Sequence, residues 1–169
     1  NTHRSSISAS YTAPKSGIHF NANAYYNSSD NDYLMRTNPA AKVYLEVPNA
    51  TYTGFDTLAS ARRFHDGYRS AMSQIEMGIA NKKWADIFVI GLTYTNIFKE
   101  IQTGATQQKV FGFLNEKSNS LAPSLRYRKD NLLLDGLSLS LFANLAQDKS
   151  VVTDTSSYST FRWNGLPDL

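Results

Sequence analysis

The stretch from Ser5 to Ala13, SSISASYTA, alternates residue by residue between polar and apolar side chains. Successive side chains of a β-strand point to opposite faces of a sheet, so the alternation predicts a strand with one apolar and one polar face. A turn-forming segment, PKSG, follows at residues 14–17, and residues 18–27, IHFNANAYYN, resume the alternation. These segments predict an antiparallel hairpin with two strands of about ten residues each.

The same pattern recurs twice further along the chain. Each recurrence has two alternating segments joined by a polar turn, and the two lie within residues 73–98 and 121–146. Long connections are expected to join the hairpins or to follow the last one, near residues 28–67, 99–118 and 147–169. No shift in composition marks a second domain. We therefore expect residues 1–169 to form one all-β, antiparallel, up-and-down segment of about six strands.

The composition excludes several classes of protein. The 169 residues carry a formal net charge of +3, contain no cysteine and are 18% charged, below the ~25% usual for soluble domains. Serine, threonine and asparagine number 19, 13 and 14, and ten tyrosines accompany nine phenylalanines. The absence of cysteine excludes disulfides and thiolate metal sites. The basic residues are scattered along the chain, so no nucleic-acid partner is expected.

Motifs for catalysis and metal binding are missing from the sequence. The three histidines, His3, His19 and His65, lie in separate segments without the spacing that would converge on one ion. No Gly-x-Ser-x-Gly, His-Glu-x-x-His or Walker-type motif is present. The sequence therefore predicts no catalytic residue, no metal site and no cofactor, and a protein that is not an enzyme.

The polar face of the predicted strands indicates a membrane protein. It consists mostly of serine, asparagine, glycine, alanine and threonine with few charges, which suits an enclosed aqueous lumen. Strands of about 10–13 residues exceed the ~5–6 residues common in globular proteins. Aromatic side chains near the strand ends would form interfacial girdles; they are Tyr11, Tyr26, Tyr94 and Tyr127. Because outer-membrane barrels have about eight or more strands, six strands would form part of a transmembrane β-barrel.

A soluble protein can show the same alternation. A β-sandwich binding module, for example one that binds carbohydrate, also has alternating strands joined by loops. That alternative predicts that Ile18, Phe20, Leu139 and Leu141 lie in a dry interior shared by two stacked sheets. A passive porin is a further alternative, and it would conduct without a plug.

Several segments resemble the barrel of TonB-dependent outer-membrane receptors of the Bacteroidetes type. The resemblance is carried by FHDGYRS at residues 64–70, EMGI at 76–79 and NKKWAD at 81–86. Segments 27–36, 99–104 and 152–158 are similar too. The family's plug, its TonB-contacting box and its terminal strand ending in an aromatic residue have no counterpart here. The resemblance therefore implies a barrel segment.

The resemblance also implies a function, partners and a location. Such receptors lie in the outer membrane of Gram-negative bacteria and import a scarce nutrient, such as an iron chelate, cobalamin, a glycan or a peptide. Expected partners are outer-membrane lipid, the plug and remaining barrel strands of the parent chain, TonB acting through that chain, and the nutrient. The short turns would face the periplasm and the long connections the outside. The substrate itself is not predicted.

Ligand contact is expected from aromatic and arginine side chains of the first long connection, since these residue types are common binding anchors. The candidates are Tyr44, Tyr52, Phe55, Arg62, Arg63, Phe64 and Tyr68.

Overall fold

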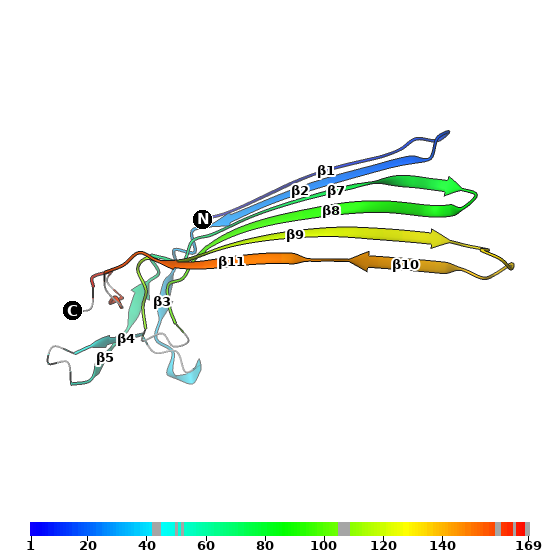
Figure 1. Ribbon diagram of the computed structural model, residues 1–169. Coiled ribbons are helices and arrows are strands. Elements are labelled where there is room, and N and C mark those ends of the chain that lie inside the picture. Colours follow the sequence, from blue (N-terminus) through cyan, green and yellow to red (C-terminus); the bar gives the residue numbers. More distant parts are fainter. Residues whose placement is uncertain are drawn as a thin grey trace.

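The computed structural model describes residues 1–41, 45–49, 51, 53–104, 109–157, 160–163 and 165–167. A long antiparallel sheet dominates this part of the chain (Figure 1). Its strands are β1 (Thr2–Thr12), β2 (Ile18–Ser29), β7 (Tyr68–Lys82), β8 (Ala85–Glu100), β9 (Leu114–Lys129), β10 (Leu139–Asn144) and β11 (Gln147–Asp154). They follow one another across the sheet in chain order, with β10 and β11 both paired to β9. The expected all-β, up-and-down hairpin fold is thus confirmed.

β10 and β11 are two pieces of one strand, interrupted opposite Pro123. Asn144 faces Ser124 and Gln147 faces Leu121, so both pieces keep the same register on β9. Between them Leu145 donates its N–H to the Pro123 carbonyl at 3.1 Å. Proline has no N–H to return, so the ladder loses one hydrogen bond and the strand is broken at that point. The loop expected from residue 147 is therefore wrong up to Asp154, where strand pairing ends.

The two ends of the sheet differ. At the short-turn end, residues 13–17 join β1 to β2, residues 83–84 join β7 to β8, and residues 130–138 join β9 to β10. Gly17 has φ +69° there, a left-handed conformation that favours glycine. At the loop end, residues 30–67 and 101–113 make the longer connections. The second connection is shorter than the expected 99–118, because β8 extends to Glu100 and β9 begins at Leu114.

The first long connection contains structure of its own below the loop end of the sheet (Figure 1). Two small antiparallel ladders and a turn of 3-10 helix occupy it: β3 (Leu34–Arg36) with β6 (Ser60–Arg62), β4 (Leu45–Pro48) with β5 (Phe55–Leu58), and η1 (Pro39–Ala41). The buried hydrophobic cluster of the described chain combines Leu45 and Ala61 of this connection with Val110 of the second connection and with Phe161 and Trp163, which follow β11. The long sheet has no comparable core.

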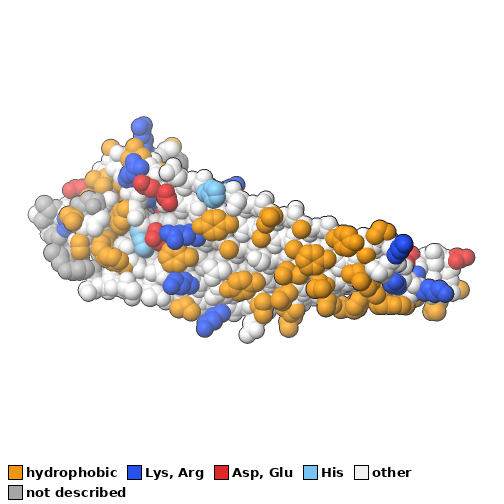
Figure 2. Space-filling view, turned by 90° about the horizontal axis from the view of Figure 1, so that it is seen from above, with side chains coloured by type: hydrophobic (Ala, Val, Ile, Leu, Met, Phe, Trp, Pro, Cys, Tyr) orange, Lys and Arg blue, Asp and Glu red, His pale blue; other side chains and the backbone are white. Residues whose placement is uncertain are grey.

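The pairing register sorts the long strands into two faces. The face that carries Ile7, Ile18, Ile75, Ile90 and Leu141 is called the apolar face. Its side chains form rows across the strands, and one row runs through Tyr11, Phe20, Met77, Ile90, Leu125 and Ala143. Hydrophobic side chains gather over the part of this face toward the short-turn end (Figure 2).

The opposite face, called the polar face, carries Ser8, Asn23, Gln74, Thr93 and Ser124. Hydrogen bonds join neighbouring strands there, including Asn23 Nδ2 to Gln74 Oε1 at 3.3 Å. Apolar exceptions occur, among them Tyr25 and Phe142, which are exposed. The polar face is thus a hydrogen-bonding surface of mostly small side chains.

No second sheet covers the apolar face in the part of the chain that the structure describes. Ile18 is 54% exposed, Leu139 46% and Leu141 50%. The dry two-sheet interior that a β-sandwich requires is absent from the described residues, since a sandwich buries such side chains between its layers. Among those residues there is also no helix long and apolar enough to cross a membrane.

Candidate functional site

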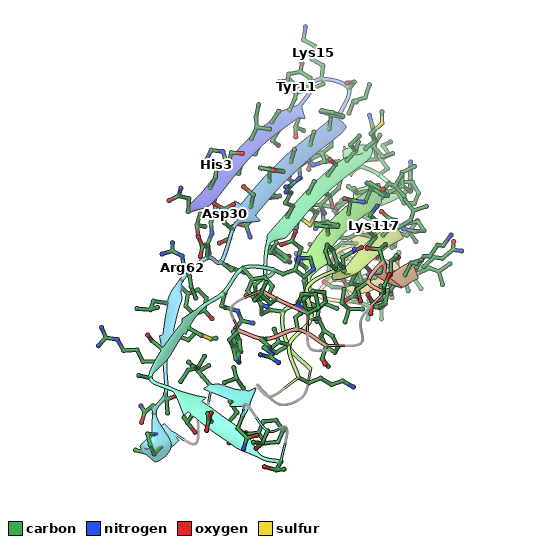
Figure 3. The ribbon with its side chains drawn as sticks, turned by 90° about the vertical axis from the view of Figure 1, so that its left-hand side faces the viewer. His3, Tyr11, Lys15, Asp30, Arg62 and Lys117 are labelled. Atoms are coloured by element: carbon green, nitrogen blue, oxygen red, sulfur yellow. The ribbon has the colours of Figure 1, made fainter. Side chains whose placement is uncertain are left out.

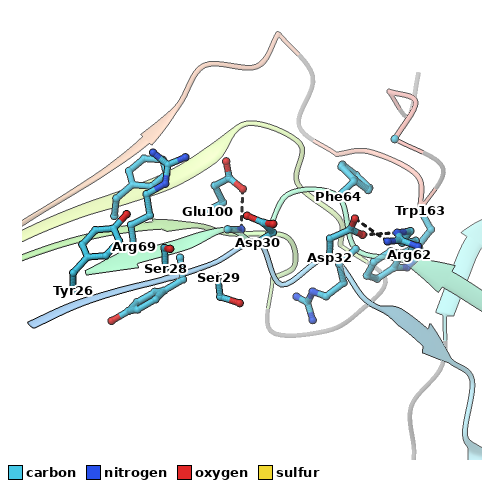
Figure 4. A pocket seen from close by; sticks show the side chains of 15 residues that line it. Tyr26, Ser28, Ser29, Asp30, Asp32, Arg62, Phe64, Arg69, Glu100 and Trp163 are labelled. Atoms are coloured by element: carbon cyan, nitrogen blue, oxygen red, sulfur yellow. Dashed lines mark hydrogen bonds and ion pairs between the residues drawn. The ribbon is translucent and has the colours of Figure 1, made fainter. Parts of the chain in front are cut away.

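A hollow of the described chain lies at the loop end, where β2, β7 and β8 run into the long connections (Figure 4). Its volume is about 950 Å³. Figure 3 shows Asp30 and Arg62 at this end of the molecule, far from Tyr11 and Lys15 at the short-turn end. The lining combines aromatic rings with charged groups of both signs and includes Tyr26, Asp32, Tyr68, Arg69, Glu100 and Trp163.

The structure brings four of the predicted ligand residues together in this hollow. Arg62, Arg63, Phe64 and Tyr68 all line it, because β6 ends and β7 begins beside one another there. Phe55 does not line it; this residue lies on β5 with 59% of its side chain exposed. Tyr44 and Tyr52 lie outside the described residues.

Arg62 forms a two-point ion pair with Asp32 on the wall of the hollow. Its Nε lies 2.6 Å from Oδ1 and its terminal amino group lies 3.0 Å from Oδ2. The hydrogen bonds from Arg62 lower the pKa of Asp32 below its usual value, and its positive charge adds to the effect. Both side chains are largely exposed, so the pair orients two chain segments without adding much stability.

The side chain of Arg63 is more buried than that of Arg62. It is 15% exposed, and its Nε lies 3.0 Å from Asp66 Oδ2. It also donates to the Tyr33 hydroxyl at 3.3 Å and lies over the Tyr33 ring, 5.7 Å from its centre. Partial burial raises the pKa of Asp66, and the attraction of Arg63 only partly offsets that effect. Arg63 therefore fixes the loop that leads to Phe64.

Gln102 anchors the loop from the other side. It is 1% exposed, and its Oε1 accepts hydrogen bonds from the backbone N–H groups of Phe64 and His65, each at 2.7 Å. Its Nε2 donates to the Phe111 carbonyl at 3.3 Å. One buried amide thus connects the two long connections and sets where Phe64 enters the hollow.

Glu100 completes the anchoring at the start of β7. Its Oε2 accepts from the Gly67 N–H at 2.8 Å, and the same oxygen lies 3.8 Å from His65 Nδ1. A side chain at Gly67 would place its Cβ 2.8 Å from that oxygen, so glycine allows this close approach. The hollow is held by residues that the ligand prediction did not include, namely Asp32, Glu100, Gln102 and Trp163.

The chemistry available in the hollow is that of binding. Aromatic faces and paired charges can stack on and hydrogen-bond to a polar ligand. In the described ranges no three histidine, aspartate or glutamate side chains converge to hold a metal ion. No protein-family model, curated protein or solved structure matches the chain. The function is therefore argued from the chain's own geometry.

Proposed function

We propose that the long sheet is part of the wall of a transmembrane β-barrel in a TonB-dependent outer-membrane receptor, and that this receptor imports a scarce nutrient. The observation that carries the proposal is the contrast between the two faces of a single-layer sheet. The apolar face is half-exposed and uncovered in the described chain, whereas the polar face forms a hydrogen-bonded surface.

The dimensions of the apolar face support a membrane wall. Four successive rows, from that of Ile18 to that of Ile7, span seven residues along each strand, as residues 18–24 of β2 do. At ~3.4 Å per residue the six steps between the first and last row cover ~20 Å of strand. A tilted strand crosses the hydrocarbon core with about 9–11 residues. A soluble protein rarely leaves so continuous an apolar surface in water.

Aromatic side chains lie at both limits of these rows. The ring centres of Trp84 and Phe88 lie 5.5 Å apart near the short-turn end, where the Tyr127 hydroxyl donates to the Trp84 carbonyl at 2.8 Å. Tyr94 lies in the row of Ile7, and Tyr26 lies one row farther toward the loops. The positions of Tyr26, Tyr94 and Tyr127 support girdles, which place amphipathic rings at membrane–water interfaces, whereas Tyr11, expected among them, lies one row inside the limit, beside Phe20.

The sheet edges also support a larger closed barrel. In the described chain neither β1 nor the β10–β11 strand has a partner on its outer side. Unpaired N–H and C=O groups cannot be satisfied by hydrocarbon, so a membrane-spanning sheet must close. We infer that further strands complete the wall, and that the hollow at the loop end contributes to nutrient binding through Arg62, Phe64 and Tyr68.

Spin labels test the two faces directly, because the chain has no cysteine to interfere. Ile75→Cys places a label on the apolar face, and Gln74→Cys places one on the polar face next to it. In outer-membrane vesicles we expect the first label to be relaxed by oxygen, which enters lipid, and the second by a water-soluble nickel chelate. Nickel access at both sites would contradict a membrane wall. Protection of the Ile75→Cys label from both reagents would favour a sandwich.

Uptake measurements test the transport class. We expect deletion of the gene to reduce uptake of one nutrient among a ferric chelate, cobalamin, an oligosaccharide and a peptide. An uncoupler should reduce the same uptake, because TonB-dependent import needs energy from the inner membrane. Uptake that depends on the gene but is insensitive to the uncoupler would indicate a passive porin instead.

A further inference from the structure

A row of the apolar face beyond the hydrophobic rows carries two cations. The register aligns Ser28, Arg69, Phe98, Lys117 and Val151 across β2, β7, β8, β9 and β11. Arg69 and Lys117 therefore flank Phe98 on the same face, two strand spacings or ~10 Å apart at Cα. Positively charged side chains lie next to the hydrophobic area on the side toward the loops (Figure 2).

A groove of about 390 Å³ separates the two cations. Its lining includes Tyr26, Arg69, Ala71, Asn96, Phe98 and Lys117, of which Tyr26, Arg69 and Phe98 also line the hollow at the loop end. Ala71 and Asn96 are paired neighbours in the next row toward the membrane rows, and their small side chains leave the space open. The groove thus has cations on two sides and aromatic rings beside them.

Neither cation forms an ion pair within the described chain. The ion pairs there engage Arg62, Arg63, Arg126, Arg128 and Lys129 among the lysines and arginines. No carboxylate of the described residues forms an ion pair with Arg69 or Lys117, and both side chains are exposed. Glu100, two residues beyond Phe98 on the same face, lines the hollow beside Arg69. Two positive charges so close together, neither of them in an ion pair, attract an anion.

The position of Arg69 and Lys117 along the membrane normal matches that of the lipid headgroups. Their row lies four residues beyond the row of Tyr94, the last of the four hydrophobic rows. That is ~13 Å along the strands, or ~10 Å along the membrane normal for a tilt near 40°. The headgroup layer begins at the edge of the hydrocarbon core, and long cationic side chains can bend toward it.

We propose that Arg69 and Lys117 bind the phosphate group of an anionic lipid whose acyl chains cover the adjoining hydrophobic rows. The inference rests on the proposed membrane wall. A lipid suits the site better than a soluble anion because the cations adjoin aromatic and aliphatic surface on one side. A phosphate between them would leave the acyl chains directed toward Tyr94 and Leu121.

The test compares lipid binding by the full-length protein, purified in a neutral detergent, using native mass spectrometry. The probes are phosphatidylglycerol, which is anionic, and phosphatidylcholine, which has no net charge. We expect Arg69→Gln combined with Lys117→Gln to lower the preference for phosphatidylglycerol on the order of 30-fold, since each cation near an anionic surface contributes about a fivefold effect.

Two variants serve as controls. Lys99→Gln removes one charge from β8 next to Phe98, but on the polar face, and should leave the preference unchanged. Arg69→Lys combined with Lys117→Arg keeps both charges and should retain most of the preference. These variants separate a local phosphate site from a general loss of positive charge or of folding.

Three results would overturn the proposal: an unchanged preference in the double glutamine variant, an equal loss in Lys99→Gln, or equally tight binding of inorganic phosphate. Failure of the membrane wall itself is distinguishable. In that case the protein would stay dispersed without detergent and the spin labels would report water on both faces.

Discussion

An arginine at the centre of the apolar face should destabilise the protein strongly in lipid. Leu92 lies in the third of the four hydrophobic rows and is 47% exposed, so an arginine there meets little steric resistance from the protein. If the surroundings are water, the cost should stay within ~0.5 kcal/mol, as for an ordinary surface substitution. If they are hydrocarbon, Leu92→Arg should cost about 2–4 kcal/mol, as arginine does at the middle of a bilayer.

Neighbouring positions supply the comparison. Thr93→Arg introduces the same side chain one residue away on the polar face and should cost much less than Leu92→Arg. Ile18→Arg, in the row nearest the short-turn end, should cost about 0–1 kcal/mol because arginine is tolerated near the interface. The expected order of destabilisation is therefore Leu92→Arg, then Ile18→Arg and Thr93→Arg.

The assay is equilibrium unfolding by guanidinium in lipid vesicles, followed by the intrinsic fluorescence of Trp84 and Trp163. A difference of ~3 kcal/mol between Leu92→Arg and Thr93→Arg corresponds to more than a hundredfold change in the unfolding equilibrium. If the two variants differ by less than ~0.5 kcal/mol, the apolar face does not contact hydrocarbon and the argument from the two faces is wrong.

Three further predictions concern the loop end and the sheet interior. Gln102→Ala leaves the backbone N–H groups of Phe64 and His65 without their acceptor, so it should lower the free energy of unfolding by about 1–3 kcal/mol and speed the hydrogen exchange of those two amides. Gln102→Glu keeps an acceptor and should restore slow exchange. Because the pKa of Asp66 is raised in the folded protein, its protonation stabilises the folded loops at a pH below the usual pKa of an aspartate, and this stabilisation is lost as the pH rises through the pKa of the folded state. NMR titration should show the higher pKa. Asp66→Asn should remove this pH dependence of stability. Gly78→Ala should destabilise the sheet more than Gly91→Ala in thermal unfolding, because the added Cβ would collide with the Phe88 backbone, whereas at Gly91 its nearest neighbour is a serine hydroxyl that can rotate.

The strands and their faces were predictable because alternation of period two fixes both at once. Ile18, Ile75 and Ile90 each lie on the apolar side of their strand's alternation, and in the structure they share one face. The strand Gln147–Asp154 was missed, since QDKSVVTD mixes polar and apolar residues on both parities. It pairs because it continues the register of β10 after the break opposite Pro123, which no local pattern reveals.

The candidate site was predictable only in part. Arg62, Arg63 and Phe64 stood out as an arginine–aromatic cluster, and they line the hollow together. Gln102 carries no sequence signal of its own, because its role depends on backbone groups 37 and 38 residues away. Asp32 was missed for the same reason, since its partner Arg62 lies 30 residues further along the chain. Long-range pairing of this kind is fixed by the fold.

The contrast between the two ends of the sheet bears on how such a protein can diversify. Extending a flexible loop costs little, about 0.6 kcal/mol for each doubling of its length, so insertions at the loop end leave the strand register intact. The two-residue link between Lys82 and Ala85 and the left-handed Gly17 allow no such freedom. Lineages that share this scaffold can therefore acquire new binding preferences through insertions on one rim while the other rim stays constant in length.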